Sequence, residues 1–335
     1  MKLKRWSALM VACIFMVATF SLGGCSEKEE TPPAQSTTPP ATTEFFNIAT
    51  GGTSGTYYPL GGALAAIMNS NVANVNATAQ TTGASVSNVN SLNTDESQIA
   101  FIQNDIAFYA YDGSEMFVDN KVSTLKGIST LYPETCQLVT LKSSGITSIE
   151  DLKGKKISVG AAGSGTEANA RQILAANGIT YDDISVQYLS FGESSQGLKD
   201  GNIDAALVTA GHPTAAITEL ATTNDAVIIA ITDVTADALI ADYPFYTKVV
   251  IPADTYKGQT EDVQTVAVMA MLAVTDSMSE DMAYNITKAL YSNLDNMKNT
   301  HAAAADMSAD TAKEGMSIPM HPGAEKYFNE IEAAK

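Results

Sequence analysis

The sequence predicts an α/β protein of two lobes. Short apolar runs with strand character alternate with helix-like segments, and this alternation is typical of parallel sheets covered by helices. The same order of elements occurs twice along the chain, which indicates two lobes joined by a hinge. A loop rich in glycine and hydroxyl side chains opens each repeat, at residues 51–58 and 160–166.

The first 44 residues have the composition of a leader followed by a tether. Three basic residues precede an apolar run at 6–20, which is shorter than the ~20 residues of a membrane-spanning helix, and a Leu-Gly-Gly-Cys sequence then ends at Cys25. We expect a lipoprotein signal peptide at 1–24 and lipid on Cys25; the alternative is an ordinary signal peptide with a chance cysteine. Residues 25–44 lack an aliphatic pattern and are expected to form a disordered tether.

Charge and cysteine content exclude several functions. Without residues 1–24 the chain keeps 16 basic and 37 acidic residues, a net charge of −21, which argues against nucleic acid and anionic lipid surfaces as partners. Cys136 would be the only cysteine left besides Cys25, so we expect no intramolecular disulfide. The histidines lack metal-ligand spacing and no CxxC or HExxH motif occurs, so no metal or other cofactor is expected.

Each repeat consists of three strand-like runs that lead into helix patterns. In the first repeat, the runs are 45–50, 74–80 and 98–105, and in the second they are 155–160, 186–190 and 203–213. An apolar run at 263–275 and helices at 279–298, 301–314 and 323–334 are expected after them.

The predicted chain path crosses twice between the lobes. Lobe 1 is expected to comprise residues 45–133 plus 250–335, and lobe 2 residues 134–249. The crossings near 131–140 and 232–252 would form the hinge.

The two opening loops are the strongest candidates for a binding site. Ligands of parallel sheets bind at the carboxyl ends of the strands, where glycine allows close approach of the backbone and helix N-termini favour an anion. The same residue types also serve as plain N-caps and tight turns, which is the alternative for either loop. The candidates are Thr53, Ser54, Gly55, Thr56 and Tyr57 in the first loop and Ser164, Gly165 and Thr166 in the second.

Further candidates follow other strands. Asp105 could receive a ligand's ammonium group, with Gln103 beside it, or could simply cap a helix; a carboxylate facing the cleft would favour an amino acid, and its absence a keto or plain dicarboxylic acid. The remaining candidates, each with a structural alternative, are Ser85 and Asn88 at a third helix start, Tyr132 beside the loops, and His212 at a strand end.

An arginine clamp is not expected for the anion. Arg171 is the only arginine after residue 24, and Glu167 lies four residues before it in the order that favours a surface ion pair. The anion would therefore depend mostly on amides, hydroxyls and helix ends.

Competing functions have weaker support. Gly160, Gly163 and Gly165 form only a partial dinucleotide-binding pattern. A serine hydrolase would have to use Ser164 and His212 without the usual nucleophile turn. A ligand-sensing lipoprotein that signals to a receptor kinase would have the same cleft as a transport receptor, so the sequence leaves that alternative open.

At these residues the sequence resembles the TAXI family of solute receptors of TRAP transporters, which are tripartite secondary transporters. The resemblance runs from about residue 45 to the C-terminus. It rests on IATGGTSGTYYPLGGALA, GISTLYPETCQLVT, SGITSIEDLKGKKISVGAAGSGTEANARQIL, LKDGNIDAAL, IPADTY and IPMHPGAEKYF.

The resemblance implies a two-lobed, periplasmic-binding-protein-like (type II-like) fold that closes on a small organic acid of the glutamate or 2-oxoglutarate class. It implies a binding protein rather than an enzyme, on the extracytoplasmic face of the membrane and anchored there at Cys25, with a TRAP membrane subunit as partner. The family's cleft positions carry over to 51–58 and 163–166, and less surely to Ser85 and Gln103.

Overall fold

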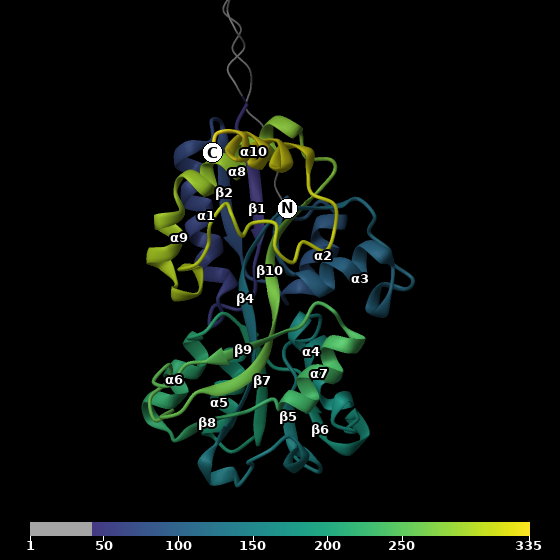
Figure 1. The fold of residues 1–335 in the computed structure, drawn as a ribbon, viewed down its shortest axis with the longest axis vertical. Helices are drawn as coiled ribbons and strands as arrows, with labels where there is room; N and C mark the ends of the chain where they lie inside the picture. Colours follow the sequence, from purple (N-terminus) through teal and green to yellow (C-terminus); the bar gives the residue numbers. More distant parts are fainter. Residues whose placement is uncertain (1–41) are drawn as a thin grey trace, which may run out of the picture. The chain divides into compact units, whose positions relative to one another are not determined.

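A ten-stranded mixed sheet runs through residues 42–335, the part of the chain that the computed structural model describes (Figure 1). The strand order is β2-β1-β3-β10-β4-β7-β5-β6, with β8 paired to β4 and β9 to β10. The strands are β1 (Glu44–Ala49), β2 (Val75–Gln80), β3 (Ile99–Gln103), β4 (Leu125–Leu141), β5 (Lys156–Ser158), β6 (Ser185–Gln187), β7 (Ala205–Ala210), β8 (Ala226–Ile229), β9 (Thr247–Ile251) and β10 (Val263–Thr275). The predicted signal peptide at 1–24, Cys25 and most of the predicted tether lie outside the described residues.

Helices cover the sheet in two groups, which define the lobes (Figure 1). Lobe 1 combines β1, β2 and β3 with α1 (Tyr57–Asn71), α2 (Ser85–Asn93), α3 (Asn104–Asp112), α8 (Glu280–Ser292), α9 (Leu294–Thr300) and α10 (Pro322–Ala333). Lobe 2 combines β5 to β9 with α4 (Gly165–Ala176), α5 (Phe191–Lys199), α6 (Ala215–Thr223) and α7 (Asp233–Asp242). The long strands β4 and β10 extend through both lobes.

The repeated strand–helix order gives each lobe a parallel core, as the sequence predicts. β1 pairs in parallel with β2 and β3, and β5 pairs in parallel with β6 and β7. The two sets are not separate sheets, however, because β4 and β10 pair with each other and with both sets in antiparallel orientation. The α/β fold class is therefore confirmed, with a single mixed sheet in place of two parallel ones.

The second crossing between the lobes lies later in the chain than expected. The sequence placed it at 232–252, but β9 pairs with the first half of β10, from Val263 to Ala267. Ile251 and Tyr256 are buried in a lobe 2 cluster together with residues of α5, β7 and α6. Residues 250–262 consequently pack on lobe 2, and the chain returns to lobe 1 within β10.

One predicted helix is absent and another was missed. Residues 301–314 form only a short 3-10 turn (Ala302–Ala304) and further turns. Local bonds compete with helical ones there: the His301 ring accepts a hydrogen bond from Ala303 N–H, and the Ser308 hydroxyl accepts one from Thr311 N–H. Conversely, α7 forms within a segment that the sequence had placed in a crossing.

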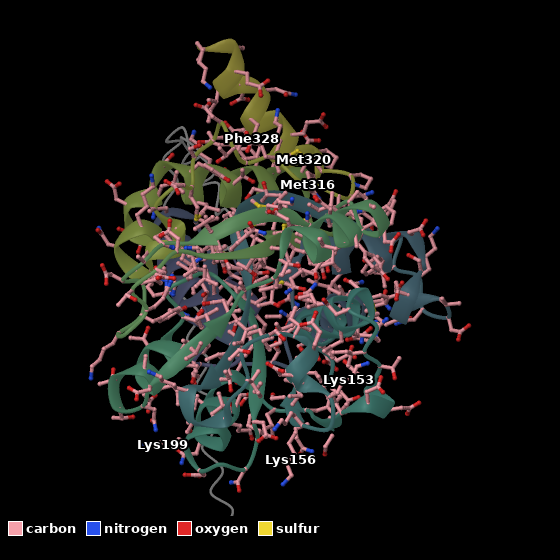
Figure 2. The ribbon with its side chains drawn as sticks, turned by 60° about the horizontal axis from the view of Figure 1, so that its bottom comes forward. Lys153, Lys156, Lys199, Met316, Met320 and Phe328 are labelled. Carbon is pink, nitrogen blue, oxygen red and sulfur yellow. The ribbon has the colours of Figure 1, made fainter. Side chains whose placement is uncertain are left out.

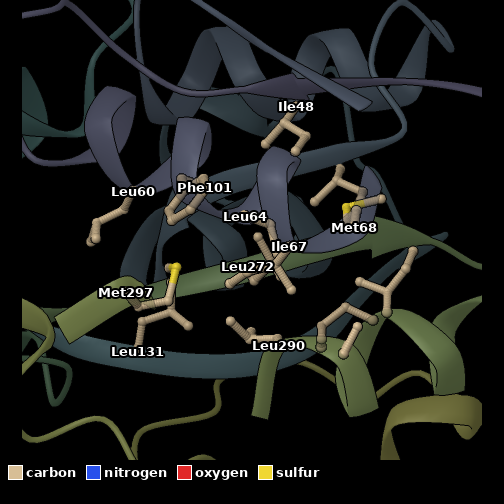
Figure 3. Close-up of a cluster of buried hydrophobic side chains, with 14 of the residues drawn as sticks. Ile48, Leu60, Leu64, Ile67, Met68, Phe101, Leu131, Leu272, Leu290 and Met297 are labelled. Carbon is tan, nitrogen blue, oxygen red and sulfur yellow. The ribbon is translucent and has the colours of Figure 1, made fainter. Parts of the chain in front are cut away.

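Lobe 1 has the larger apolar core, centred on α1 (Figure 3). Leu60, Leu64 and Met68 recur at helical spacing and are fully buried, because they line the face that packs on the sheet. Ile48 from β1 and Phe101 from β3 belong to the same cluster. Truncation of such a side chain to alanine typically costs about 2–5 kcal/mol, so this core holds the loop before α1 in place.

No helix within residues 42–335 combines the length and the apolar character that a membrane crossing requires.

Candidate ligand-binding site

A cavity of about 310 Å³ lies between the lobes, at the carboxyl ends of the parallel strands. This volume is at the lower end of the ~300–1,000 Å³ typical of small-molecule sites. Its walls come from the segments after β1, β2, β5 and β6 and from the ends of β3 and β7. The lining residues are Gly51, Gly52, Thr53, Ser54, Gly55, Thr56, Tyr57, Thr81, Thr82, Gly83, Ala84, Ser85, Gln103, Glu134, Ala161, Ser164, Gly165, Thr166, Ser190, Phe191, Gly192, Thr209 and Ala210.

Five α-helices begin at this cavity. The N-cap residues of α1, α2, α4 and α5 are Thr56, Ala84, Ser164 and Ser190, and all four line the cavity. The first turn of a helix has backbone N–H groups without intrahelical partners and carries the positive end of the helix dipole. Gln103, the N-cap of α3, lines the cavity too, so three α-helices of lobe 1 and two of lobe 2 direct partial positive charge toward it.

The helix ends of the two lobes differ in their caps. In lobe 2, Ser164 accepts a hydrogen bond from Glu167 N–H, and Ser190 forms a capping box with Glu193. In lobe 1, neither Thr56 nor Ala84 makes a side-chain cap. The third residue of α1 is Pro59, which has no N–H, and the third N–H of α2, that of Ser87, is bonded to the Gly163 carbonyl, so the amides left to a ligand anion are those of the first two residues of each helix.

The backbone at the start of α2 is strained. Ala84 has φ +71° and ψ −148°, a conformation that glycine adopts readily and alanine does not. Strain of this kind costs about 1–3 kcal/mol and is concentrated at ligand sites.

The cavity is closed by direct contacts between the lobes. The Thr56 hydroxyl donates to the Gly211 carbonyl at 3.2 Å, and Ala216 N–H donates to the Ser54 carbonyl at 3.2 Å. On the other side, Ser87 N–H donates to the Gly163 carbonyl at 3.1 Å. Both glycine- and hydroxyl-rich loops thus take part in closure as well as in lining the cavity.

Gly165 allows the lobes to approach each other. A Cβ added at Gly165 would lie 1.9 Å from Gln103 Oε1, so a side chain there would have to displace the Gln103 amide group. Gln103 Oε1 is buried and has no hydrogen-bond partner among residues 42–335, and Gln103 lines the cavity. The Ser85 hydroxyl accepts a hydrogen bond from Gln103 N–H at 3.1 Å and so fixes the end of β3 against α2.

Most of the predicted site residues line this cavity. They are Thr53, Ser54, Gly55, Thr56, Tyr57, Ser85, Gln103, Ser164, Gly165 and Thr166. Four others do not line it: Asn88, Asp105, Tyr132 and His212. Asn88 supports the wall from behind, because its Nδ2 donates to the carbonyls of Thr50 and Phe101 at 2.6 and 2.7 Å.

Asp105 contacts lobe 2 instead of the cavity. Its Oδ2 accepts from Asn169 Nδ2 of α4 at 3.0 Å, and Asn169 also donates to the Tyr246 hydroxyl at 2.8 Å. The network continues through Gln172 to Tyr109. We call Asp105, Tyr109, Asn169, Gln172 and Tyr246 the α3–α4 seam; burial raises the pKa of Asp105 to about 7, partly offset by the bonds from Ile106 N–H and Asn169.

Tyr132 and His212 also contact other parts of the protein and not the cavity. Tyr132 is buried in the lobe 1 core, and the His212 ring nitrogen Nδ1 lies 2.8 Å from the Thr135 hydroxyl. Burial lowers the pKa of His212. The Ser164 hydroxyl caps α4 and forms no hydrogen bond with His212, so the pair does not form the nucleophile and base of a serine hydrolase.

Glu134 is the most informative residue that the sequence analysis missed. It lies in β4, is 2% exposed, and lines the cavity. Tyr57 donates to its Oε2 at 2.7 Å. Burial raises the pKa of Glu134, and the nearby Asp105 adds to this rise, while the Tyr57 bond lowers the pKa. The sequence contained a signal for this residue, because Glu134 is the single acidic residue in the otherwise uncharged run at 127–140.

Positive side chains are absent from the lining. None of the lining residues is Lys, Arg or His. Arg171 lies outside the cavity and pairs with Glu115 at 3.2 Å and, as predicted, with Glu167 at 3.7 Å. Within residues 42–335, no group of three or more His, Cys, Asp or Glu side chains is arranged to hold a metal ion.

Solved structures share this fold at low sequence identity. PhnD1 from Prochlorococcus marinus (MIT 9301), solved in complex with methylphosphonate, is 10% identical with a TM-score of 0.55 over 86% of this chain and 96% of that one. A putative L-cystine ABC transporter from Listeria monocytogenes is 16% identical, with a TM-score of 0.51 over 81% and 99%. A protein of Bordetella bronchiseptica RB50 is 14% identical, with a TM-score of 0.57 over 86% and 98%.

These likenesses place the chain in the two-lobed α/β fold of periplasmic binding proteins. The sequence itself gives a closer relationship, because a family model matches residues 48–331, nearly the whole described region. The chain belongs to the NMT1-like family.

Proposed function

We propose that this protein is an extracytoplasmic solute-binding receptor that captures a small organic acid in the cavity between its lobes. The observation that carries the proposal is the meeting of five helix N-termini at one cavity that no cationic side chain lines. Such a site stabilises a carboxylate through backbone amides and hydroxyls. The NMT1-like family match supports the proposal.

The carboxylate is assigned to the lobe 1 side of the cavity. The starts of α1 and α2 lack side-chain caps, whereas α4 and α5 have serine caps. An anion bound by lobe 1 would satisfy free amides there, and lobe 2 would then close over it through the contacts of Thr56 and Ser87.

The physiological role that fits best is delivery of the acid to a TRAP transporter membrane subunit. This assignment rests on the resemblance of the sequence motifs to TAXI receptors. The same resemblance supports a ligand of the glutamate or 2-oxoglutarate class and membrane anchoring through lipid on Cys25. The shared fold with PhnD1, solved with methylphosphonate, also supports a small anion as ligand.

Isothermal titration calorimetry on ligand-free protein tests the proposal. The panel contains glutamate, 2-oxoglutarate, glutarate and other small mono- and dicarboxylic acids, with the corresponding dimethyl esters as uncharged controls. We expect at least one acid to bind with one site per chain and its ester not to bind. Absence of heat from every acid, together with unchanged thermal unfolding in their presence, would refute the proposal.

A further inference from the structure

Glu134 is a buried acid without a cationic partner. It lies in β4, which passes between the lobes, and it is the only acidic residue among those that line the cavity. The hydroxyl of Tyr57 is the one group within residues 42–335 that donates a hydrogen bond to its side chain. An ionised carboxylate has room for about four hydrogen bonds, so most of its capacity is unused in the closed protein.

Within residues 42–335, no lysine, arginine or histidine side chain forms an ion pair with Glu134. Arg171 is engaged with Glu115 and Glu167 outside the cavity. The lysines labelled in Figure 2, Lys153, Lys156 and Lys199, lie at the far end of lobe 2. An uncompensated buried charge is costly, and an isolated carboxylate favours a cation brought by a ligand.

The cavity thus has two poles of opposite character. Five helix N-termini favour an anion, whereas Glu134 disfavours one and favours an ammonium group. A plain dicarboxylate would satisfy the helix ends but would lie beside an unpaired acid. A zwitterion satisfies both poles at once, because it carries an ammonium group close to a carboxylate.

Asp105, the acid that the sequence suggested for this role, is already engaged. Its two oxygens accept hydrogen bonds from Ile106 N–H and Asn169 Nδ2, and it does not line the cavity. Of the two buried acids between the lobes, only Glu134 is therefore available to a ligand.

We propose that Glu134 binds the ammonium group of the solute, so that the ligand is an amino acid and the corresponding oxo acid is rejected. This inference rests on the proposed function and narrows its ligand class. Glu134 acts as the specificity-determining residue, while the helix ends hold the carboxylate that both ligand types share.

Matched ligand pairs provide the test. Calorimetry compares glutamate with 2-oxoglutarate, alanine with pyruvate, and leucine with 4-methyl-2-oxopentanoate, in wild-type protein and in Glu134→Gln. For each pair that binds, we expect the wild type to prefer the amino acid by at least ~30-fold, because a site built to pair with a polar group discriminates strongly against a ligand that lacks it. In Glu134→Gln this preference should fall below ~3-fold, with the oxo acid bound at least as tightly as before.

Two control variants separate specificity from folding. Glu134→Gln keeps an acceptor for the Tyr57 hydroxyl, and Glu134→Asp keeps the charge and should therefore keep the preference for the amino acid. Asp105→Asn removes the other buried acid and should leave the ratio of the two affinities unchanged.

The outcomes distinguish the inference from the function on which it rests. If oxo acids bind wild-type protein as tightly as their amino acids, or if Glu134→Gln keeps the preference, the inference is wrong while the solute-binding function stands. If no member of any pair and no other organic acid binds, the proposed function fails and the inference fails with it.

Discussion

The two lobes present helix N-termini to the same cavity, but the helices of the two lobes differ in their side-chain caps. In lobe 2, serine hydroxyls cap α4 and α5, and each accepts a hydrogen bond from one first-turn amide. In lobe 1, α1 and α2 begin without a side-chain cap, and the residue before α2 is in a strained conformation. Under the proposed function, lobe 1 would bind the anion and lobe 2 would close over it.

The lobe interface shows a second contrast, between two buried acids. Asp105 in the α3–α4 seam is held by Asn169 from the opposite lobe, whereas Glu134 in the cavity is held only by Tyr57 from its own side of the cavity. The Asp105 carboxylate is thus hydrogen-bonded on both oxygens by the protein, although Asn169 Oδ1 in the same seam has no partner among residues 42–335, whereas Glu134 keeps capacity for a ligand. Changes at the seam should affect stability, and changes in the cavity should affect binding.

The largest effect is expected from a negative charge at an uncapped helix start of lobe 1. Ala84→Asp would place a carboxylate where we expect the carboxylate of the ligand, and like-charge contacts of this kind cost several kcal/mol. We expect affinity to fall by at least ~100-fold in calorimetry. Ala84→Asn has the same shape without the charge and should lose much less; equal losses in the two variants would contradict the assignment of the anion to lobe 1.

A steric change in the lobe 2 cover should have the next largest effect. In Gly165→Ala the new Cβ would meet the end of the Gln103 side chain, so either this side chain must shift or the lobes must close less tightly. Overpacking of this kind costs about 1–3 kcal/mol, and we expect calorimetric affinity to fall ~10- to 100-fold. Gly62→Ala, where a Cβ meets nothing within 4 Å, is the matched control and should bind normally. Unchanged affinity in Gly165→Ala would show that closure does not depend on this contact.

The seam should make the stability of the protein depend on pH. Burial raises the pKa of Asp105 to about 7 in the folded protein, against about 3.9 in an unfolded chain. The stability that comes from neutral Asp105 is fully present below about pH 4. It is lost progressively as the pH rises from about 4 through 7. Relative to Asp105→Asn, ligand-free wild-type protein should lose up to ~1.4 kcal/mol per pH unit in this window.

Urea denaturation of both proteins between pH 4 and 8 measures this difference. Because the Asp105 charge also raises the pKa of Glu134, the comparison is repeated in the Glu134→Gln background, where only Asp105 differs. If the free energies of unfolding of the two proteins change with pH in parallel, Asp105 keeps one protonation state between pH 4 and 8 and the prediction is wrong.

The smallest effect is expected from removing a lobe 2 cap. Ser164→Ala takes away the acceptor for Glu167 N–H and should lower the free energy of unfolding by about 1 kcal/mol. Affinity should change less than ~3-fold, because the cap satisfies α4 rather than the ligand. A loss of binding comparable to that of Ala84→Asp would remove the distinction between the two lobes.

The sequence predicted the parts of the site that depend on local chemistry. Glycine and hydroxyl side chains at 51–57 and 164–166 are specified by turn geometry and helix starts, and both loops line one cavity as expected. The alternation of strands and helices likewise predicted the α/β core of each lobe. These features are encoded within a few neighbouring residues.

The missed features depend on pairing between distant segments. β4 and β10 join the lobes through antiparallel pairing across more than a hundred residues, and the sequence pattern of each strand does not specify its partner. Asp105 and Glu134 are both acids near strand ends or crossings, and only the packing of α3 against α4 decides which of them faces the cavity. Residues 301–314 look helical in composition, yet side-chain hydrogen bonds to the backbone favour turns.

Native mass spectrometry of freshly purified protein tests the central claim most directly. We predict one non-covalent occupant per chain, with the mass of a small organic acid, that is released on collisional activation and is absent from Ala84→Asp prepared in the same way. A wild-type protein that carries no adduct even after incubation with the acid panel, or an adduct retained equally by Ala84→Asp, would contradict the account.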